Sequence, residues 1–367
     1  MLTPLWTGDI EQNSAHIKDT GIIGSLRWWY EALVRGIDGD VCNITSQNPE
    51  ERCDYGKNRN EICNVCELFG CTGYSRRFRL EAEGFVDIPL FFVAHENVYL
   101  SNGNWISRIF EGTRNRNKEG RGTTFSFSKR MLFSPHPIEI RISTLDMYHD
   151  VYSAIYFLFW FISEYGGLGA KTQNGFGQVE FMEPNNQLLN KGKQFIKDNV
   201  RNGKKRKKGF MFDLKDFFSI EFEIEDKNPY YGVGREIGSP PEFDYRKYFI
   251  PCGFDVRYKM RSKNPFTNRG ENWGMRPFLL EKLGANNEAK KKTKFLLGDA
   301  ERGSRIFVSH LFKANPGENY HIRVWGFVPE EIEQKERVVG LIKNYICDKR
   351  TFYGAKIIKE YEEGVFC

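Results

Sequence analysis

The chain has 367 residues, of which 40% are hydrophobic and 15% aromatic, so it can build packed cores and is not globally disordered. At roughly 150 residues per domain, this length predicts two domains or three. Its formal net charge of +6 is too small to indicate a nucleic-acid partner by itself. Eight cysteines are too few for a disulfide scaffold in so long a chain, and no basic, apolar leader opens the sequence, so we expect a cytoplasmic protein.

The first half of the sequence predicts two helices among short strands. Apolar residues at helical spacing indicate a helix over 22–34. The aromatic-rich segment at about 147–165 indicates a second, buried helix, whose apolar run is too short to cross a membrane. With strand material before, between and after these helices, the order fits a ferredoxin-like β-α-β-β-α-β unit. Strand-like runs lie at 78–85, 90–95, 123–127, 138–142 and 176–181.

The second half predicts another α+β unit, which follows a strongly basic segment. Residues 191–208 contain nine Lys and Arg residues and one acidic residue, a pattern typical of a solvated linker. We therefore divide the chain into an N-terminal domain at 1–190, a basic linker at 191–209 and a C-terminal domain at 210–367. The C-terminal domain is expected to contain strands at 217–224, 305–312 and 320–327, and helices at 276–283 and 329–347.

Five of the eight cysteines lie in a stretch at 40–75 that has no sustained apolar period and looks like an insertion. Cys63 and Cys66 have the spacing of a zinc knuckle, and Cys53 with Cys71 would complete a four-thiolate site, with Cys42 as the reserve ligand. A bound metal would supply the folding energy that this polar loop cannot gain by burying side chains. We expect a structural zinc, because four thiolates leave no open position for a substrate. The alternative is a loop of reduced cysteines without metal.

A glycine-rich loop follows the second helix and places five glycines in the twelve positions 166–177. It is not a Walker loop, because Tyr165 and Ala170 stand where that motif needs glycine, and because it leads from a helix to a strand. Bare glycines let a backbone approach a polyanion, and Lys171 adds a positive charge, so the loop predicts phosphate contact without nucleotide hydrolysis. The alternative is a loop whose glycines serve positive φ angles.

The segment GGLGAKTQNGFGQV at 166–179 closely resembles the signature glycine-rich loop of the CRISPR-associated RAMP superfamily. Residues 17–29 resemble the entry to the first helix of that family, and the motif ELFG at 67–70 is similar to one that follows this helix. Residues 297–306 look like a counterpart in the second half. The aromatic version of the first helix is similar to the family of first, two-domain subunits of type III-B Cmr effector complexes.

This resemblance implies two ferredoxin-like domains and a subunit that holds guide RNA near its 3′ end, beside other subunits of the effector complex. Whether target RNA is also touched stays open. Lys18 and Arg27 match basic family positions, whereas Ile23 stands where the family often has Lys, which weakens the case for phosphate contact there. Arg302, Arg305 and the lysine-rich run at 290–294 are candidates to extend this surface, and the alternative is that they are only solvated charges; the sequence does not separate the two. The residues expected to bind RNA are Lys18, Arg27, Gly166, Gly167, Gly169, Lys171, Gly175, Gly177 and Arg305.

The histidines of the sequence are scattered and form no pair at metal-binding spacing, so a catalytic metal is not expected. The function predicted for the chain is therefore that of a non-catalytic RNA-binding and assembly subunit in antiviral defence. The alternative is a RAMP-type endoribonuclease that cuts precursor CRISPR RNA without metal. His16 is its candidate general acid or base.

Overall fold

The structure is a computed structural model of the chain. It describes residues 1–7, 17–56, 62–84, 137–145, 149–200, 212–225, 270–299, 302–313, 318–352 and 354–366, and short pieces, mainly strands, within 85–136 and 226–269. The fold is α+β, as expected, and its sheets are mostly antiparallel. Among the described helices, none combines the length and the apolar character that a membrane span requires.

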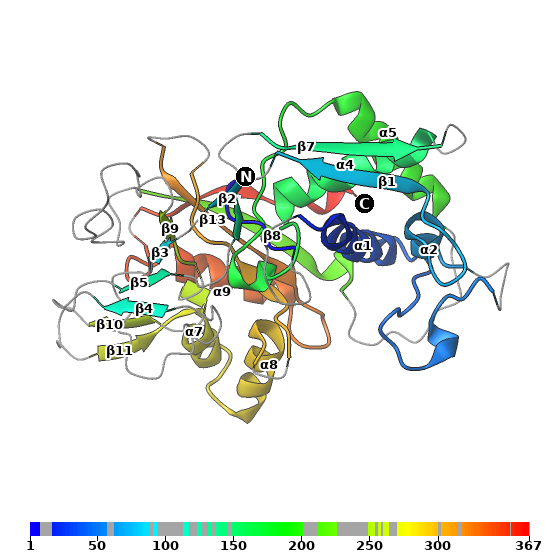
Figure 1. Ribbon diagram of the computed structural model, residues 1–367. Helices are drawn as coiled ribbons and strands as arrows, with labels where there is room; N and C mark the ends of the chain where they lie inside the picture. Colours follow the sequence, from blue (N-terminus) through cyan, green and yellow to red (C-terminus); the bar gives the residue numbers. More distant parts are fainter. Residues whose placement is uncertain are drawn as a thin grey trace, which may run out of the picture.

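The N-terminal half packs helices against an antiparallel strand pair. Strands β1 (Phe78–Glu83) and β7 (Glu139–Thr144) pair with Phe78 opposite Thr144, and helices α1 (Asp19–Gly36) and α4 (His149–Tyr165) pack against them (Figure 1). Both helices confirm the sequence prediction. The short helix α2 (Asn64–Phe69) contacts α1, so the cysteine-rich stretch is attached to the outer side of this half.

Both halves also contain short strands, and one sheet combines strands from the two halves. Strands β2 (Val86–Ile88) and β6 (Met131–Phe133) form one antiparallel pair, and β10 (Met260–Lys263) and β11 (Gly270–Trp273) form another. A separate sheet has the order β4-β5-β3-β9, in which β3 and β9 are parallel and come from different halves of the chain. Its strands are β4 (Thr113–Arg116), β5 (Thr123–Ser126), β3 (Phe91–Val93) and β9 (Phe249–Pro251).

The C-terminal half contains an antiparallel four-stranded sheet with the order β12-β13-β8-β14. Along the chain its elements follow as strand, helices, two strands, helix and strand. The predicted strand at 217–224 and the predicted strand at 320–327 are both confirmed with the same bounds. The elements are β8 (Phe217–Ile224), α7 (Met275–Lys282), α8 (Asn287–Leu297), β12 (Ile306–Val308), β13 (Tyr320–Phe327), α9 (Lys335–Ile346) and β14 (Lys356–Glu360).

The prediction of a basic linker at 191–209 is wrong for residues 191–199, which belong to a helix. Residues 186–199 form helix α5 (Asn186–Asn199), which begins at an Asn185 side chain that accepts hydrogen bonds from Gln187 N and Leu188 N. Leu189 and Ile196 are buried, and a Cβ at Gly192 would lie 2.0 Å from the Ser153 carbonyl oxygen of α4. The high charge of this segment therefore led to a wrong prediction of a linker, because its lysines lie on a helix whose apolar face packs against α4.

Three further expectations need correction. Helix α9 begins at Lys335 and not at Pro329, because residues 329–333 form turns whose hydrogen bonds end on the Pro329 carbonyl oxygen. Helix α8 was not expected from its run of lysines. The expected strand at 176–181 is not a regular strand, although the Gln178 carbonyl accepts hydrogen bonds from Leu2 N and Thr3 N at 2.9 and 3.1 Å. Gly177, at φ +80°, interrupts extended backbone there.

The two halves share one hydrophobic core. Phe217, Phe307, Trp325 and Phe327 of the second half pack in the same cluster as the apolar faces of α1 and α4. A second cluster lies between the β8 sheet and helices α7, α8 and α9. The boundary drawn at 191–209 therefore separates segments of sequence that fold against each other.

A buried ionic contact joins the halves beside this core. Arg323 of β13 donates to Glu221 Oε2 of β8 from Nη2 at 2.6 Å and from Nε at 3.0 Å, and to the Ser163 carbonyl of α4 from Nη1 at 2.6 Å. Burial by itself would raise the pKa of Glu221. Hydrogen bonds and charge from His321 and Arg323 nevertheless hold that pKa at about 2. The ion pair therefore stays intact at neutral pH.

We expect Arg323→Met to lower the free energy of unfolding by about 3–5 kcal/mol, because it leaves the Glu221 carboxylate buried without its partner. Chemical denaturation at pH 7 measures this loss. The control Arg337→Met removes a half-exposed arginine whose partner Glu333 keeps its ion pair with Lys292, and the expected loss there is below about 1 kcal/mol. Equal losses in the two variants would contradict the interpretation. The Glu221 contribution is present above its unfolded pKa of about 4.3 and is lost as the pH falls towards 2.

Candidate functional site

Four cysteine sulfurs converge between α2 and the segment that follows α1. The Sγ atoms of Cys42, Cys53, Cys63 and Cys66 all lie within 4.8 Å of one another, and all four residues are buried. Backbone contacts fix the group, since Cys53 Sγ accepts a hydrogen bond from Cys63 N at 3.2 Å and Cys63 Sγ accepts one from Cys66 N at 3.4 Å. This donor set suits one tetrahedral ion that prefers thiolate ligands.

The ligand set expected from the sequence changes at one position, because Cys42 takes the place given to Cys71. A tight turn in which Cys71 and Tyr74 exchange backbone hydrogen bonds holds Cys71 partly exposed, outside the group of four. Asn64 holds the backbone near Cys42 in place beside α2 through two hydrogen bonds to Asp40. Its side-chain oxygen accepts from Asp40 N at 3.1 Å, and its own N donates to the Asp40 carbonyl at 3.2 Å.

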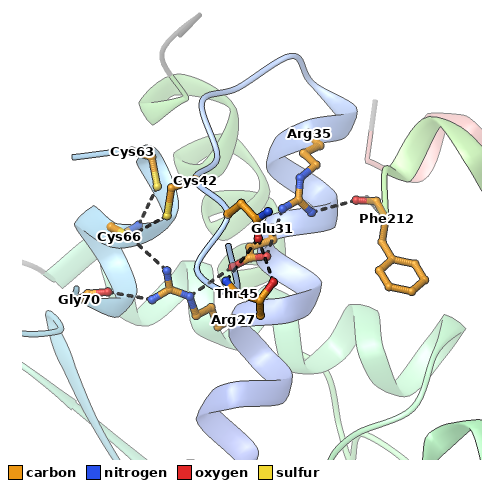
Figure 2. A network of polar contacts seen from close by, with 10 residues as sticks. Arg27, Glu31, Arg35, Cys42, Thr45, Cys63, Cys66, Gly70 and Phe212 are labelled. Atoms are coloured by element: carbon orange, nitrogen blue, oxygen red, sulfur yellow. Dashed lines mark hydrogen bonds and ion pairs between the residues drawn. The ribbon is translucent and has the colours of Figure 1, made fainter. Parts of the chain in front are cut away.

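Arg27 lies beside these sulfurs, as Figure 2 shows. Its Nη2 donates to Cys66 Sγ at 3.1 Å and its Nη1 donates to the Gly70 carbonyl at 2.7 Å. Burial alone would lower the pKa of Arg27, but the neighbouring Cys66 thiol and Glu31 carboxylate raise it, so the guanidinium is charged. Arg27 is therefore committed to the cysteine cluster, which removes it from the predicted RNA-binding set.

The same contacts continue along α1 to the second half of the chain. Glu31 accepts hydrogen bonds from Arg27 Nε at 3.2 Å and from Arg35 Nη2 at 3.1 Å. Arg35 Nη1 in turn donates to the Phe212 carbonyl at 3.0 Å (Figure 2). The charged residues of α1 thus connect the cysteine cluster, through partly buried hydrogen bonds, to the segment that enters the C-terminal half.

The loop glycines make close contacts within the protein. A Cβ at Gly166 would lie 2.1 Å from the Trp29 ring, and one at Gly177 would lie 1.9 Å from the Leu168 carbonyl oxygen. Gly169, Gly175 and Gly177 also have φ angles of +84°, +97° and +80°. Packing and positive φ therefore explain these glycines, as the alternative interpretation proposed. Contact of the loop with phosphate stays a prediction.

The basic residues predicted to bind RNA lie in different surroundings. Lys18 is exposed at the start of α1, and its N donates to Thr7 Oγ1 at 3.2 Å. Lys171 has a φ of +55° and places its Nζ 3.7 Å from the centre of the Trp6 ring. Because Ala170 N also donates to the Trp6 carbonyl, at 2.7 Å, residues 6 and 7 hold Lys18 and the glycine loop side by side.

Arg305 is buried and does not extend this surface. Its guanidinium lies 4.7 Å from the ring centres of both Phe212 and Phe295, and burial lowers its pKa. In the lysine-rich run at 290–294, Lys292 pairs with Glu288 and Glu333 at 3.0 and 3.2 Å. The alternative catalytic residue, His16, lies outside the described residues.

A cleft of about 440 Å³ opens where α1, the glycine loop and the second half meet. Sequence reasoning missed it, because its aromatic residues come from four distant segments and each resembles an ordinary core residue. Its lining residues are Gly21, Gly24, Ser25, Trp28, Trp29, Gly167, Gly169, Ala170, Lys171, Thr172, Gln173, Phe212, Gly303, Ser304, Phe307 and Trp325.

Gly177 of the glycine loop and Gly24 of α1 should respond oppositely to substitution by alanine. Gly177→Ala forces a Cβ against the Leu168 carbonyl at positive φ, and we expect it to cost about 3 kcal/mol of stability or more. Gly24 lies within α1, and its Cβ would meet nothing within 4 Å. Gly24→Ala should therefore add about 1 kcal/mol through helix propensity. Thermal and chemical unfolding of both variants measures the difference, and similar stabilities would refute this account of the loop.

Comparison with known proteins gives a family for the first half of the chain. Residues 1–180 match the family model of the RAMP superfamily. A sequence search found no match among curated proteins. Among solved structures, the chain is similar to the crystal structure of Cmr1 from Pyrococcus furiosus in its apo form, with 14% identity over 92% of this chain and 89% of that one, at a TM-score of 0.34.

Proposed function

We propose, from the match of residues 1–180 to the RAMP superfamily, that this chain is a non-catalytic RNA-binding and assembly subunit of a type III-B CRISPR effector complex. It would hold guide RNA near its 3′ end beside sister subunits. The observation that carries the proposal is the position of the loop. Residues 6 and 7 contact both the glycine loop and the start of α1, so Lys171 and Lys18 bring two positive charges to one region, and Lys171 also lines an aromatic cleft.

We infer that both halves are variants of the ferredoxin-like domain. In the second half, the element order from β8 to β14 and the sheet order β12-β13-β8-β14 support this assignment. In the first half, α1, the β1–β7 pair and α4 supply the central elements. The pairing of residues 2–4 with 177–178 supplies the contact expected of the outer strands.

The surroundings of His310 and His321 argue against a catalytic role for these two residues. His310 is fully buried, and burial lowers its pKa to about 3, so it is neutral at physiological pH. His321 pairs through Nδ1 with Glu221 at 2.8 Å. Neither side chain lines the cleft. A general acid or base must reach the scissile phosphate, so these two histidines do not suit RNA cleavage.

The RNA-binding surface predicts a charge-dependent affinity. Lys171→Glu should weaken binding of short labelled RNA about tenfold or more at low salt and flatten the dependence of log K on log salt, because it removes a phosphate contact. Lys356→Glu is the matched control, since Lys356 lies on β14, at the opposite edge of the sheet from β12. Fluorescence anisotropy over a salt series makes the measurement.

Equal affinities and slopes for the two lysine variants would count against this surface. The same RNA, incubated with the protein in EDTA, should stay intact. Specific cleavage that His16→Ala abolishes would instead support the endoribonuclease alternative.

Purification of the tagged chain from its native cells should also recover guide RNA and sister subunits.

We further propose that the cysteine cluster holds one structural zinc ion. Four buried sulfurs within 4.8 Å form a closed donor set, and four thiolates so close together require a compensating cation. Arg27 adds a positive charge beside Cys66, which suits a site whose four thiolates outweigh the charge of a divalent ion. The metal would stabilise the fold of the 40–75 insertion.

Elemental analysis of the purified protein should find about one zinc per chain, as one tetrahedral site requires. Cys42→Ser should lose the metal and destabilise the insertion, whereas Cys71→Ser should retain it, because Cys71 lies outside the group. Full zinc content in Cys42→Ser would refute this ligand set. Loss of zinc in Cys71→Ser alone would restore the set expected from the sequence.

A further inference from the structure

We propose that the cleft between α1, the glycine loop and β12 holds one unpaired nucleotide of RNA, with its base stacked on the aromatic floor. This inference rests on the proposed RNA-binding function and adds a specific site to it. A cleft of about 440 Å³ lies in the range of small-ligand pockets and is large enough for one nucleotide. Single-stranded RNA is commonly bound by stacking its splayed bases on aromatic side chains.

Aromatic rings from both halves of the chain form the floor. Trp28 of α1 lies 4.7 Å from Phe212 and 6.5 Å from Phe307, between ring centres. Phe307 in turn stacks on Trp325 at 4.0 Å with the planes 8° apart. Trp325 is almost fully buried, whereas Trp28 and Phe212 keep exposed surface. The inner rings thus support the outer two, and the outer two are the ones that a base can reach.

The rim supplies the groups that a nucleotide needs besides stacking. Lys171 is the one charged side chain among the described lining residues, so the lining carries no negative charge that would repel a phosphate and one positive charge that attracts it. Ser25, Thr172 and Gln173 add hydroxyl and amide groups, which can pair with the edge of a base. A cleft lined by neutral rings and one cation complements a nucleotide, which has a flat neutral base and an anionic phosphate.

Two glycines leave the walls open. A Cβ at Gly24 of α1 would meet nothing within 4 Å, and one at Gly303 would meet only Gln173 Oε1, at 3.9 Å. Neither position requires glycine for packing, in contrast to Gly166 and Gly177. The missing side chains keep free the space that a base would occupy. A larger residue at either position therefore fills the cleft without disturbing its own neighbours.

The test uses Gly24→Leu, which projects a neutral side chain into the cleft, and Gly340→Leu as the matched control. Gly340 lies within α9, lines no part of this cleft, and its Cβ would also meet nothing within 4 Å. Short labelled oligouridylate and oligoadenylate are the probes. We expect Gly24→Leu to weaken binding about tenfold, which is the scale of one lost stacking contact, and Gly340→Leu to bind as the wild type does.

Salt dependence separates this proposal from the phosphate surface. Gly24→Leu removes no charge, so its log K should fall by the same amount at every salt concentration, whereas Lys171→Glu should flatten the slope. Gly303→Leu fills the cleft from the opposite wall and should repeat the effect if Gly24→Leu folds poorly. Folded cleft variants with wild-type affinity would overturn the nucleotide site, while a Lys171→Glu effect would still uphold the proposed function.

Two further outcomes decide the source of the nucleotide. Uridine or adenosine monophosphate should compete weakly, because a free nucleotide lacks the neighbouring phosphates of a strand. Binding of either monophosphate more tightly than the oligomers, with loss in Gly24→Leu, would overturn RNA as the occupant. Failure of the wild-type protein to bind any of these probes would overturn both the cleft and the RNA-binding proposal.

Discussion

The packing of Trp29 is the contact on which the rest of this structure depends. Its ring lies 5.9 Å from Phe161 of α4, 5.6 Å from Phe217 of β8 and 5.0 Å from Trp325 of β13, between ring centres. Its Nε1 donates to the Gly167 carbonyl at 3.1 Å. One side chain of α1 therefore fixes the second helix, the glycine loop and the second half together. Each such aromatic pair contributes about 0.5–1.5 kcal/mol beyond the apolar area that it buries.

This constraint explains the cleft as well as the core. Because Gly166 has no Cβ, the loop approaches the Trp29 ring closely, and its following residues form one wall of the cleft. Trp28, the preceding residue on α1, lies between the two halves, where its ring contacts Phe212 and Phe327 of the second half. The proposed RNA site is thus a consequence of how the halves pack, and neither half contains it alone.

The charged face of α1 has an equally structural role. Arg27, Glu31 and Arg35 connect the cysteine cluster to the Phe212 carbonyl through partly buried hydrogen bonds (Figure 2). Ion pairs at this spacing on an exposed helix contribute little to stability. Here Arg27 and Arg35, at the two ends of the network, also donate hydrogen bonds to other elements of the structure. The cysteine insertion is therefore tied to the same helix that joins the two halves.

The sequence by itself determined the elements whose pattern is local. Helices α1 and α4 and strands β8 and β13 follow from apolar periodicity, the cysteine cluster follows from density and spacing, and the glycine loop follows from composition. Tertiary structure alone decided Cys42 over Cys71, because a hydrogen-bonded turn and the Asp40–Asn64 contact orient those thiols. It also decided that Arg27 and Arg305 face inward, that 186–199 is a packed helix, and that aromatic residues from four distant segments share one cleft. Such outcomes depend on which surfaces meet, and a local pattern of charge or hydrophobicity does not encode the partner that will cover it.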